Sequence, residues 1–145
     1  MDIPVKHILF SCTLNAIRSV MAEGFFNRIA PEGWHARSCG VIAGPSDGFT
    51  FTVMEEAGIP IDLNRQSKLF TDYNADDVDY AVSLSVEAQF HLASWVMDIP
   101  HEHWKVKEPF SADANREVQL SHYRLIRDEI RTHVGELVSR ITNNT

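Results

Sequence analysis

The stretch Ile8-Leu9-Phe10-Ser11-Cys12-Thr13-Leu14-Asn15-Ala16-Ile17-Arg18-Ser19 decides the fold of this chain. It begins as an apolar run of the kind that forms a buried strand, and a helical pattern starts near Arg18. Cys12 therefore stands where a strand ends and a helix begins. At such a junction, backbone N–H groups without helical partners point at one spot, and the helix dipole adds partial positive charge. The stretch predicts an anion-binding loop with a thiol at its floor.

Two side chains of this loop suit the binding of a tetrahedral oxyanion. The field at the junction favours a thiolate over a thiol, which makes Cys12 a candidate nucleophile. The planar guanidinium of Arg18, six residues later, can hold two oxygens of the anion at once. The simpler alternative is that Cys12 is a buried core thiol and Arg18 a solvated helix residue. The flanking strand and helix patterns favour the anion loop.

The composition limits the class of protein. A chain of 145 residues suits one domain, expected to span 1–145. The net charge of −7 opposes sequence-independent binding to nucleic acid. No apolar run approaches the roughly 20 residues of a membrane span, and Met1-Asp2-Ile3-Pro4 lacks the basic start of a signal peptide. Two cysteines indicate a reducing compartment, so we expect a cytoplasmic protein without a membrane partner.

Short apolar runs alternate with helical patterns along the first part of the chain. This alternation predicts β-α-β units and a parallel sheet that is covered by helices on both faces. Strands are expected at 7–11, 34–40, 80–84 and 104–106, and helices at 18–30 and 49–57. A third helix is expected to follow Ser85, which can cap it, and to end at about residue 96. The segment 59–79 is irregular, with at most short helical turns. A last helix is predicted by an apolar stripe of Val118, Tyr123, Ile126, Ile130, Val134, Leu137 and Ile141.

The loop resembles that of the low-molecular-weight protein tyrosine phosphatase family, in which a C-x5-R-S motif follows the first strand. Further stretches that resemble the family are Ser38-Cys39-Gly40-Val41, Ser83-Leu84-Ser85 and Tyr123-Arg124-Leu125-Ile126-Arg127-Asp128. The resemblance implies an α/β fold with three layers, α/β/α, and a four-stranded parallel sheet in the order 2-1-3-4. It also implies a hydrolase that works through a cysteinyl-phosphate. The absence of a glycine-rich nucleotide motif and of a credible zinc pattern among the histidines fits catalysis without metal or cofactor.

The resemblance also assigns roles within the loop. Cys12 would attack phosphorus, and Arg18 would stabilise the transition state. Asn15 would hold a left-handed turn, a conformation that Asn tolerates better than most residues, and Ser19 would donate a hydrogen bond to the thiolate. The other residues expected to bind substrate are Thr13, Leu14, Ala16, Ile17 and Phe110. The substrate would be a phosphorylated protein or a small aryl phosphate, and inorganic phosphate or a similar oxyanion should bind in the loop.

The general acid is where the sequence departs from the family, which uses an Asp-Pro pair after the fourth strand. Glu108 takes that position here, followed by Pro109 and by Phe110 as an aromatic wall. A glutamate can also donate a proton, although its longer side chain changes the reach. We expect Glu108 to protonate the leaving oxygen and then to activate water. Asp98 is the alternative candidate for the acid. If Glu108 has no catalytic role, it is a solvated carboxylate in a loop.

Two further departures affect the loop. Leu14 stands where many family members have Gly, which changes the loop's shape and substrate preference. Ile17 stands where some members have a second Cys that traps the nucleophile as a disulfide, so oxidised Cys12 lacks that protection unless Cys39 intervenes. A buried structural thiol is the more ordinary role for Cys39. His101 and His103 are expected in a solvent-exposed loop.

Two other functions remain open. One is arsenate reduction, because related folds bind arsenate in the same loop. The thioredoxin-linked type needs further cysteines after the third strand, and Leu84 to Thr145 has none, which leaves a glutathione-linked or thiol-assisted type. The other is a phosphate- or phosphopeptide-binding module whose catalysis has decayed through Leu14 and Glu108.

Overall fold

Four parallel strands form a sheet in the order β2-β1-β3-β4. The computed structural model describes residues 5–95, 98–109 and 115–143. The elements are β1 Lys6–Cys12, α1 Arg18–Ile29, β2 Trp34–Gly40, α2 Gly48–Glu56, η1 Phe70–Asp72, η2 Ala75–Asp77, β3 Tyr80–Ser83, α3 Val86–Trp95, β4 His101–His103 and α4 Arg116–Asn143. The predicted sheet order is confirmed, and apart from β4 the predicted boundaries agree to within one residue.

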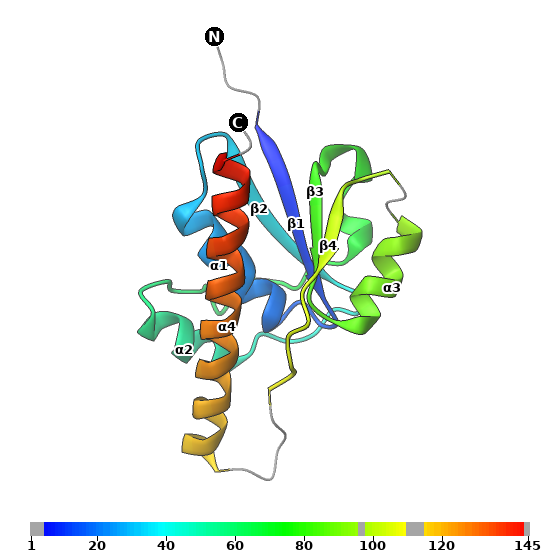
Figure 1. Cartoon of the computed structure of the whole chain (residues 1–145). Helices are drawn as coiled ribbons and strands as arrows, with labels where there is room; N and C mark the ends of the chain where they lie inside the picture. Colours follow the sequence, from blue (N-terminus) through cyan, green and yellow to red (C-terminus); the bar gives the residue numbers. More distant parts are fainter. Residues whose placement is uncertain (1–4, 96–97, 110–114, 144–145) are drawn as a thin grey trace.

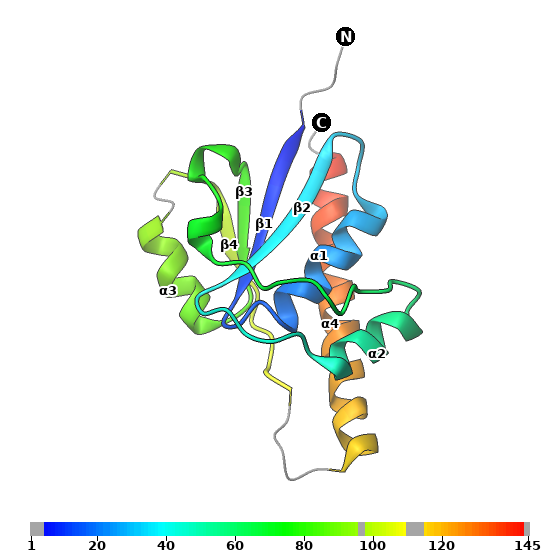
Figure 2. The ribbon, with the colours of Figure 1, turned by 180° about the vertical axis from the view of Figure 1, so that it is seen from behind.

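Helices cover both faces of the sheet, as Figures 1 and 2 show from opposite sides. Helices α1 and α4 pack together on one face, with α2 against α4, and α3 lies on the other face. Alternate residues of β1 point to opposite faces of the sheet. Ile8 and Phe10 are buried in the cluster beneath α1 and α4. Leu9 belongs to the smaller cluster beneath α3, which also contains Cys39. The three-layer α/β/α architecture is therefore confirmed.

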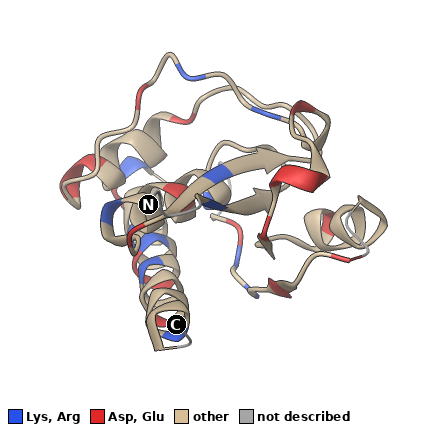
Figure 3. Cartoon of the chain, turned by 90° about the horizontal axis from the view of Figure 1, so that it is seen from above, with Lys and Arg blue, Asp and Glu red and all other residues tan. Residues whose placement is uncertain are grey.

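Helix α4 is amphipathic, and its apolar stripe faces α1 and the sheet. The buried residues are Leu120, Tyr123, Ile126, Ile130, Val134 and Leu137. The prediction that Val118 belongs to this stripe is wrong. Val118 is 42% exposed, and Leu120 is buried in the core instead. Arginines are interspersed with acidic residues along the rest of the helix (Figure 3). The helix thus buries one face and solvates the other.

The predicted fourth strand is wrong. The sheet pairs His101, Glu102 and His103 with β3, and the predicted residues 104–106 are an extended segment beyond the sheet edge. The prediction followed the apolar Trp104 and Val106, but an edge strand carries polar residues where one side meets solvent. His101 and His103 therefore lie on a strand and not in a loop.

The carboxyl ends of the strands meet at one edge, which Figure 1 shows at the bottom of the sheet. The loop from Cys12 to α1 lies at this edge, beside the start of α3 and the segment that follows β4. Ligands bind at this edge in open α/β sheets. None of the helices in the described part of the chain is long and apolar enough to cross a membrane.

Candidate active site

The loop between β1 and α1 is fixed by the segment that follows β2. The N–H groups of Val41, Ile42 and Gly44 donate to the carbonyl oxygens of Cys12, Thr13 and Leu14, at 3.2, 2.9 and 3.1 Å respectively. Gly40 pairs with Cys12 in the sheet. A Cβ on Gly40 would lie 2.7 Å from the backbone nitrogen of Asn15 and 2.8 Å from the carbonyl carbon of Leu14. Only glycine therefore allows this close approach.

Asn15 adopts the left-handed conformation predicted for it, with φ of 53°. Its side chain is fully buried, and its amide nitrogen donates to the hydroxyls of Ser19 and Ser38, both at 2.9 Å. On its other side, Arg65 donates to the Asn15 carbonyl oxygen at 2.9 Å and to Oδ1 at 3.0 Å. The backbone N–H of Lys68 donates to the same Oδ1 at 2.8 Å. These bonds stabilise a backbone conformation that is otherwise unfavourable for a non-glycine residue.

The Cys12 sulfur lies 2.9 Å from the hydroxyl oxygen of Ser19. Because the Asn15 amide already donates to that oxygen, the Ser19 hydroxyl hydrogen is available for the sulfur. The arrangement suits a thiolate, which can only accept hydrogen bonds. The interaction predicted for Ser19 thus has the geometry it requires.

The loop amides form an anion-binding cradle. Among the described residues, the backbone N–H groups from Thr13 to Ile17 find no backbone or side-chain acceptor. Helix α1 begins at Arg18, and its N-cap Ile17 makes no side-chain capping bond. Unpaired N–H groups at the positive end of a helix are satisfied well by an oxyanion.

Arg18 closes the cradle, and two carbonyl groups fix its guanidinium. Its Nη1 donates to the carbonyl oxygens of Leu84 at 3.1 Å and Val106 at 3.3 Å. Its Nη2 donates to Oε1 of Glu108 at 3.4 Å. Since a guanidinium has five N–H donors, two remain for the oxygens of a bound anion.

A pocket of about 210 Å³ stands above the sulfur. Its walls include six of the predicted site residues, which are Cys12, Thr13, Leu14, Ile17, Arg18 and Glu108, together with Pro109 and Tyr123. Asn15, Ala16 and Ser19 are buried behind the loop and contribute structure. Phe110 lies outside the described residues.

Glu108 is the carboxylate at the rim of this pocket. Its side chain is 71% exposed, whereas that of Arg18 is 8% exposed. Asp98, the alternative acid, precedes β4 and so lies at the opposite edge of the sheet, which rules out that role. A second carboxylate, Glu87 on α3, accepts a hydrogen bond from the Thr13 hydroxyl at 3.1 Å. Hydrogen bonds from its own backbone N–H and from Thr13 hold the pKa of Glu87 below its usual range.

The second cysteine does not face the pocket. Cys39 pairs with Ser11 in the sheet, so its side chain points to the face opposite Cys12 and joins the cluster around Leu9 and Phe70. Burial first, and then the charge of Cys12, raise the pKa of the Cys39 thiol. A disulfide between the two would require β2 to be rebuilt, so Cys39 cannot protect the nucleophile in this fold. Among the described residues, no three His, Cys, Asp or Glu side chains form a metal-binding cluster.

Sequence reasoning missed Arg65 and treated Tyr123 only as a core residue. Arg65 lies 50 residues from Asn15 in an irregular segment, where no periodicity signals a contact. Tyr123 is buried, but its hydroxyl donates to Asp47 at 3.3 Å and its ring lines the pocket. Burial and the adjacent Asp47 raise the pKa of Tyr123. A hydroxyl on an otherwise apolar stripe was the one signal available for this residue.

The comparisons with known proteins cover nearly the whole chain. The model of a family described as "Low molecular weight phosphotyrosine protein phosphatase" matches residues 7–145. A glutaredoxin arsenate reductase of Synechocystis is 28% identical over 138 residues, which are 95% of this chain and 100% of the relative. A structure described as an arsenate reductase in the phosphate binding state is 28% identical, with a TM-score of 0.77 over 94% of this chain and 99% of that one. The YwlE arginine phosphatase from Geobacillus stearothermophilus shares the fold, at 20% identity and a TM-score of 0.80 over 96% of this chain and 94% of that one.

Proposed function

Because the chain belongs to the low molecular weight phosphotyrosine protein phosphatase family, we propose that it is a phosphomonoester hydrolase that acts on phosphotyrosine in proteins. The observation that carries this proposal is the pocket in which the Cys12 sulfur, the Arg18 guanidinium and the Glu108 carboxyl group meet. These three groups supply a nucleophile, charge stabilisation and a proton donor. Phosphoester hydrolysis needs all three and no further group.

Substrate binding begins with the phosphoryl oxygens. The free amides of the loop and the two spare N–H groups of Arg18 would take these oxygens, with the phosphorus above the Cys12 sulfur. Leu14, which is 41% exposed, and Tyr123 offer apolar walls for an aromatic ring. Glu108, whose side chain is exposed and 3.4 Å from Arg18, can turn from the guanidinium to face the leaving oxygen.

The first chemical step forms a bond between sulfur and phosphorus. The Cys12 thiolate attacks, the bond from phosphorus to the phenolic oxygen breaks, and the proton of Glu108 passes to that oxygen. The loop amides and Arg18 stabilise the charge on the three equatorial oxygens. In the second step, Glu108 takes a proton from water as the water oxygen attacks phosphorus. The sulfur–phosphorus bond then breaks, inorganic phosphate leaves, and Cys12 returns as thiolate.

Arsenate reduction is the second candidate, because the curated relatives include arsenate reductases. Reducing arsenate to arsenite takes two electrons, which a pair of thiols supplies by becoming a disulfide. Cys12 faces the oxyanion site, but Cys39 faces the opposite layer. A reductase built on this chain would therefore draw its electrons from an external thiol, whereas phosphoester hydrolysis needs Cys12 alone. This difference favours the phosphatase.

One assay separates the candidates. We expect the wild type to release phosphate from an aryl phosphate and Cys12→Ser to release none above background. Arsenite release with added glutathione, without aryl phosphate hydrolysis, would identify a reductase instead. Tight binding of vanadate or phosphate without either turnover would indicate a binding module.

A further inference from the structure

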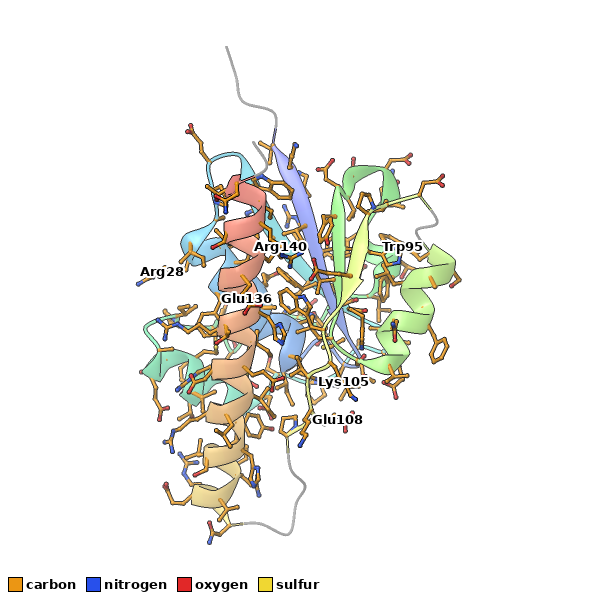
Figure 4. The ribbon with its side chains drawn as sticks, viewed as in Figure 1. Arg28, Trp95, Lys105, Glu108, Glu136 and Arg140 are labelled. Carbon is orange, nitrogen blue, oxygen red and sulfur yellow. The ribbon has the colours of Figure 1, made fainter. Side chains whose placement is uncertain are left out.

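A second hollow lies beside the catalytic pocket, beyond the ion pair of Arg18 and Glu108. Its volume is about 310 Å³, and both members of that pair line it as well as the catalytic pocket. The start of α3 forms one wall, and the segment after β4 forms the other. The second wall carries Lys105 and Lys107, and Figure 4 labels Lys105 above Glu108 on this segment.

Lys105 and Lys107 line the hollow because Val106, the residue between them, is anchored in the core. Val106 is buried, and its carbonyl oxygen accepts a hydrogen bond from Arg18, which anchors the segment. In an extended chain, residues two apart point to the same side and lie roughly 7 Å apart. Lys105 and Lys107 are both exposed, and neither forms an ion pair with any residue in the described ranges.

The ionisable groups that line the hollow leave an excess of positive charge. Arg18 and the two lysines bring three positive charges to the hollow, whereas the carboxylates of Glu87 and Glu108 bring two negative ones, and Glu108 is paired with Arg18. Burial lowers the pKa of His103, whose Nδ1 lies 2.7 Å from the Ser83 hydroxyl oxygen, and so favours the neutral imidazole. The hollow therefore keeps one excess positive charge next to the phosphoryl site, although the chain as a whole has a net charge of −7, and this local charge attracts a further anion.

We propose that Lys105 and Lys107 form a second anion subsite, which binds an acidic side chain next to the phosphorylated residue of a peptide substrate. The inference rests on the proposed function, because the phosphoryl group must occupy the loop of Cys12. Adjacent residues of an extended peptide are spaced by about 3.3 Å, and successive side chains diverge. A phosphotyrosine in the catalytic pocket therefore places a neighbouring Asp or Glu within reach of the shared wall.

The test measures peptide binding without turnover. Cys12→Ser serves as the parent, and matched phosphotyrosyl peptides carry either Asp and Glu or Asn and Gln beside the phosphotyrosine. Dissociation constants are measured by fluorescence anisotropy at two salt concentrations. Lys105→Gln with Lys107→Gln tests the subsite. Lys6→Gln is the matched control, because Lys6 is exposed at the start of β1, at the opposite edge of the sheet.

We expect the parent to bind the acidic peptide about three- to tenfold more tightly than its neutral twin, as two partly screened ion pairs allow. The double lysine variant should bring this ratio close to one, added salt should reduce it, and Lys6→Gln should preserve it. A ratio near one in the parent, a ratio that survives in the double variant, or no measurable binding of either peptide would overturn the subsite. Failure of the wild type to hydrolyse aryl phosphates would overturn the phosphatase alone, since the binding ratio is measured independently.

Discussion

Glu108 reaches the site from an exposed segment, and its contact with Arg18 is what holds it at the pocket rim. The distance of 3.4 Å and the exposure of the side chain describe a carboxyl group that can turn between the guanidinium and a leaving oxygen. A glutamate at this place supplies the same proton as an aspartate from a longer stem. Its contribution should therefore depend on how much the leaving group needs a proton.

Replacing Glu108 by Gln tests this dependence. We expect kcat for phenyl phosphate to fall about 10²-fold, the lower range for loss of a general acid, because phenolate is a poor leaving group. The fall should be clearly smaller for the bond-breaking step of 4-nitrophenyl phosphate, whose phenol leaves without a proton. The measurement is the release of each phenol, in the first turnover, by both enzymes. Equal losses for the two substrates would show that Glu108 has no acid role.

Asn15 combines a strained backbone with a hub of hydrogen bonds, and two substitutions separate these contributions. Asn15→Gly keeps the left-handed conformation accessible, whereas Asn15→Ala does not. We expect Ala to lower the free energy of unfolding by about 1 kcal/mol more than Gly does. Both variants should lose about 10²-fold in kcat/KM, because the bonds that the Asn15 side chain makes with Ser19 and Arg65 disappear in each. Urea unfolding and aryl phosphate kinetics provide the two readouts, and full activity in Asn15→Gly would contradict the positioning role.

At the scale of elements, the loop after β1 depends on contact with the segment after β2. Gly40 makes this contact possible, because any Cβ there would meet the backbone of residues 13–15. The sequence predicted a strand that ends at Gly40, but not the contact of this residue with the anion loop. The spacing of residues along the chain indicates where a single strand or helix lies. It does not show that two backbones approach each other closely, because that depends on how both segments are placed in the sheet.

Gly40→Ala should therefore damage the site and the fold together. We expect a loss of about 1–3 kcal/mol in the free energy of unfolding, as is usual for overpacking, and weaker binding of vanadate. Gly48→Ala is the matched control, because a Cβ on Gly48, in the first turn of α2, would meet nothing within 4 Å. Isothermal titration with vanadate and urea unfolding of both variants provide the measurements. Unchanged vanadate affinity in Gly40→Ala would contradict the proposed packing.

The same limit explains which elements could be predicted. β1, α1 and β2 have strong apolar periodicity, so their bounds follow from the sequence. β4 could not be predicted in this way, because its residues at the sheet edge are polar: Glu102 receives hydrogen bonds from Trp104 and Arg140. The Cys12 and Arg18 part of the site was predicted because it lies within one loop. The contact of Arg65 with Asn15 could not be predicted, because it joins segments 50 residues apart in the sequence.

At the scale of the whole molecule, an ionic contact joins α4 to strand β4 of the sheet. Arg140 donates to both carboxylate oxygens of Glu102, each at 3.0 Å, and Trp104 donates to Oε2 at 2.7 Å. The Tyr80 hydroxyl also donates to this carboxylate. Burial opposes ionisation of Glu102, but the hydrogen bonds, first among them those from Arg140, outweigh it and lower the pKa.

This contact should make stability depend on pH. Because the pKa of Glu102 is lower in the folded state, its contribution is complete above the unfolded value of about 4.3 and is lost as pH falls through the folded value. Glu102→Gln should cost about 1–2 kcal/mol at pH 7 and progressively less below about pH 4. Glu136→Gln, at an exposed position on α4 that Figure 4 labels, is the control. Unfolding in urea at several pH values tests this, and a cost of Glu102→Gln that stays constant from pH 7 to pH 3 would contradict it.

The central claim is that the Cys12 sulfur takes the phosphoryl group from the substrate. The most direct measurement uses Glu108→Gln, in which activation of water is impaired, with 4-nitrophenyl phosphate. The reaction is stopped with acid within one turnover, and the peptide that contains Cys12 is examined by mass spectrometry. The account predicts phosphate bound to Cys12 in an amount that matches the burst of nitrophenol. Release of nitrophenol with no phosphate on Cys12 would contradict it.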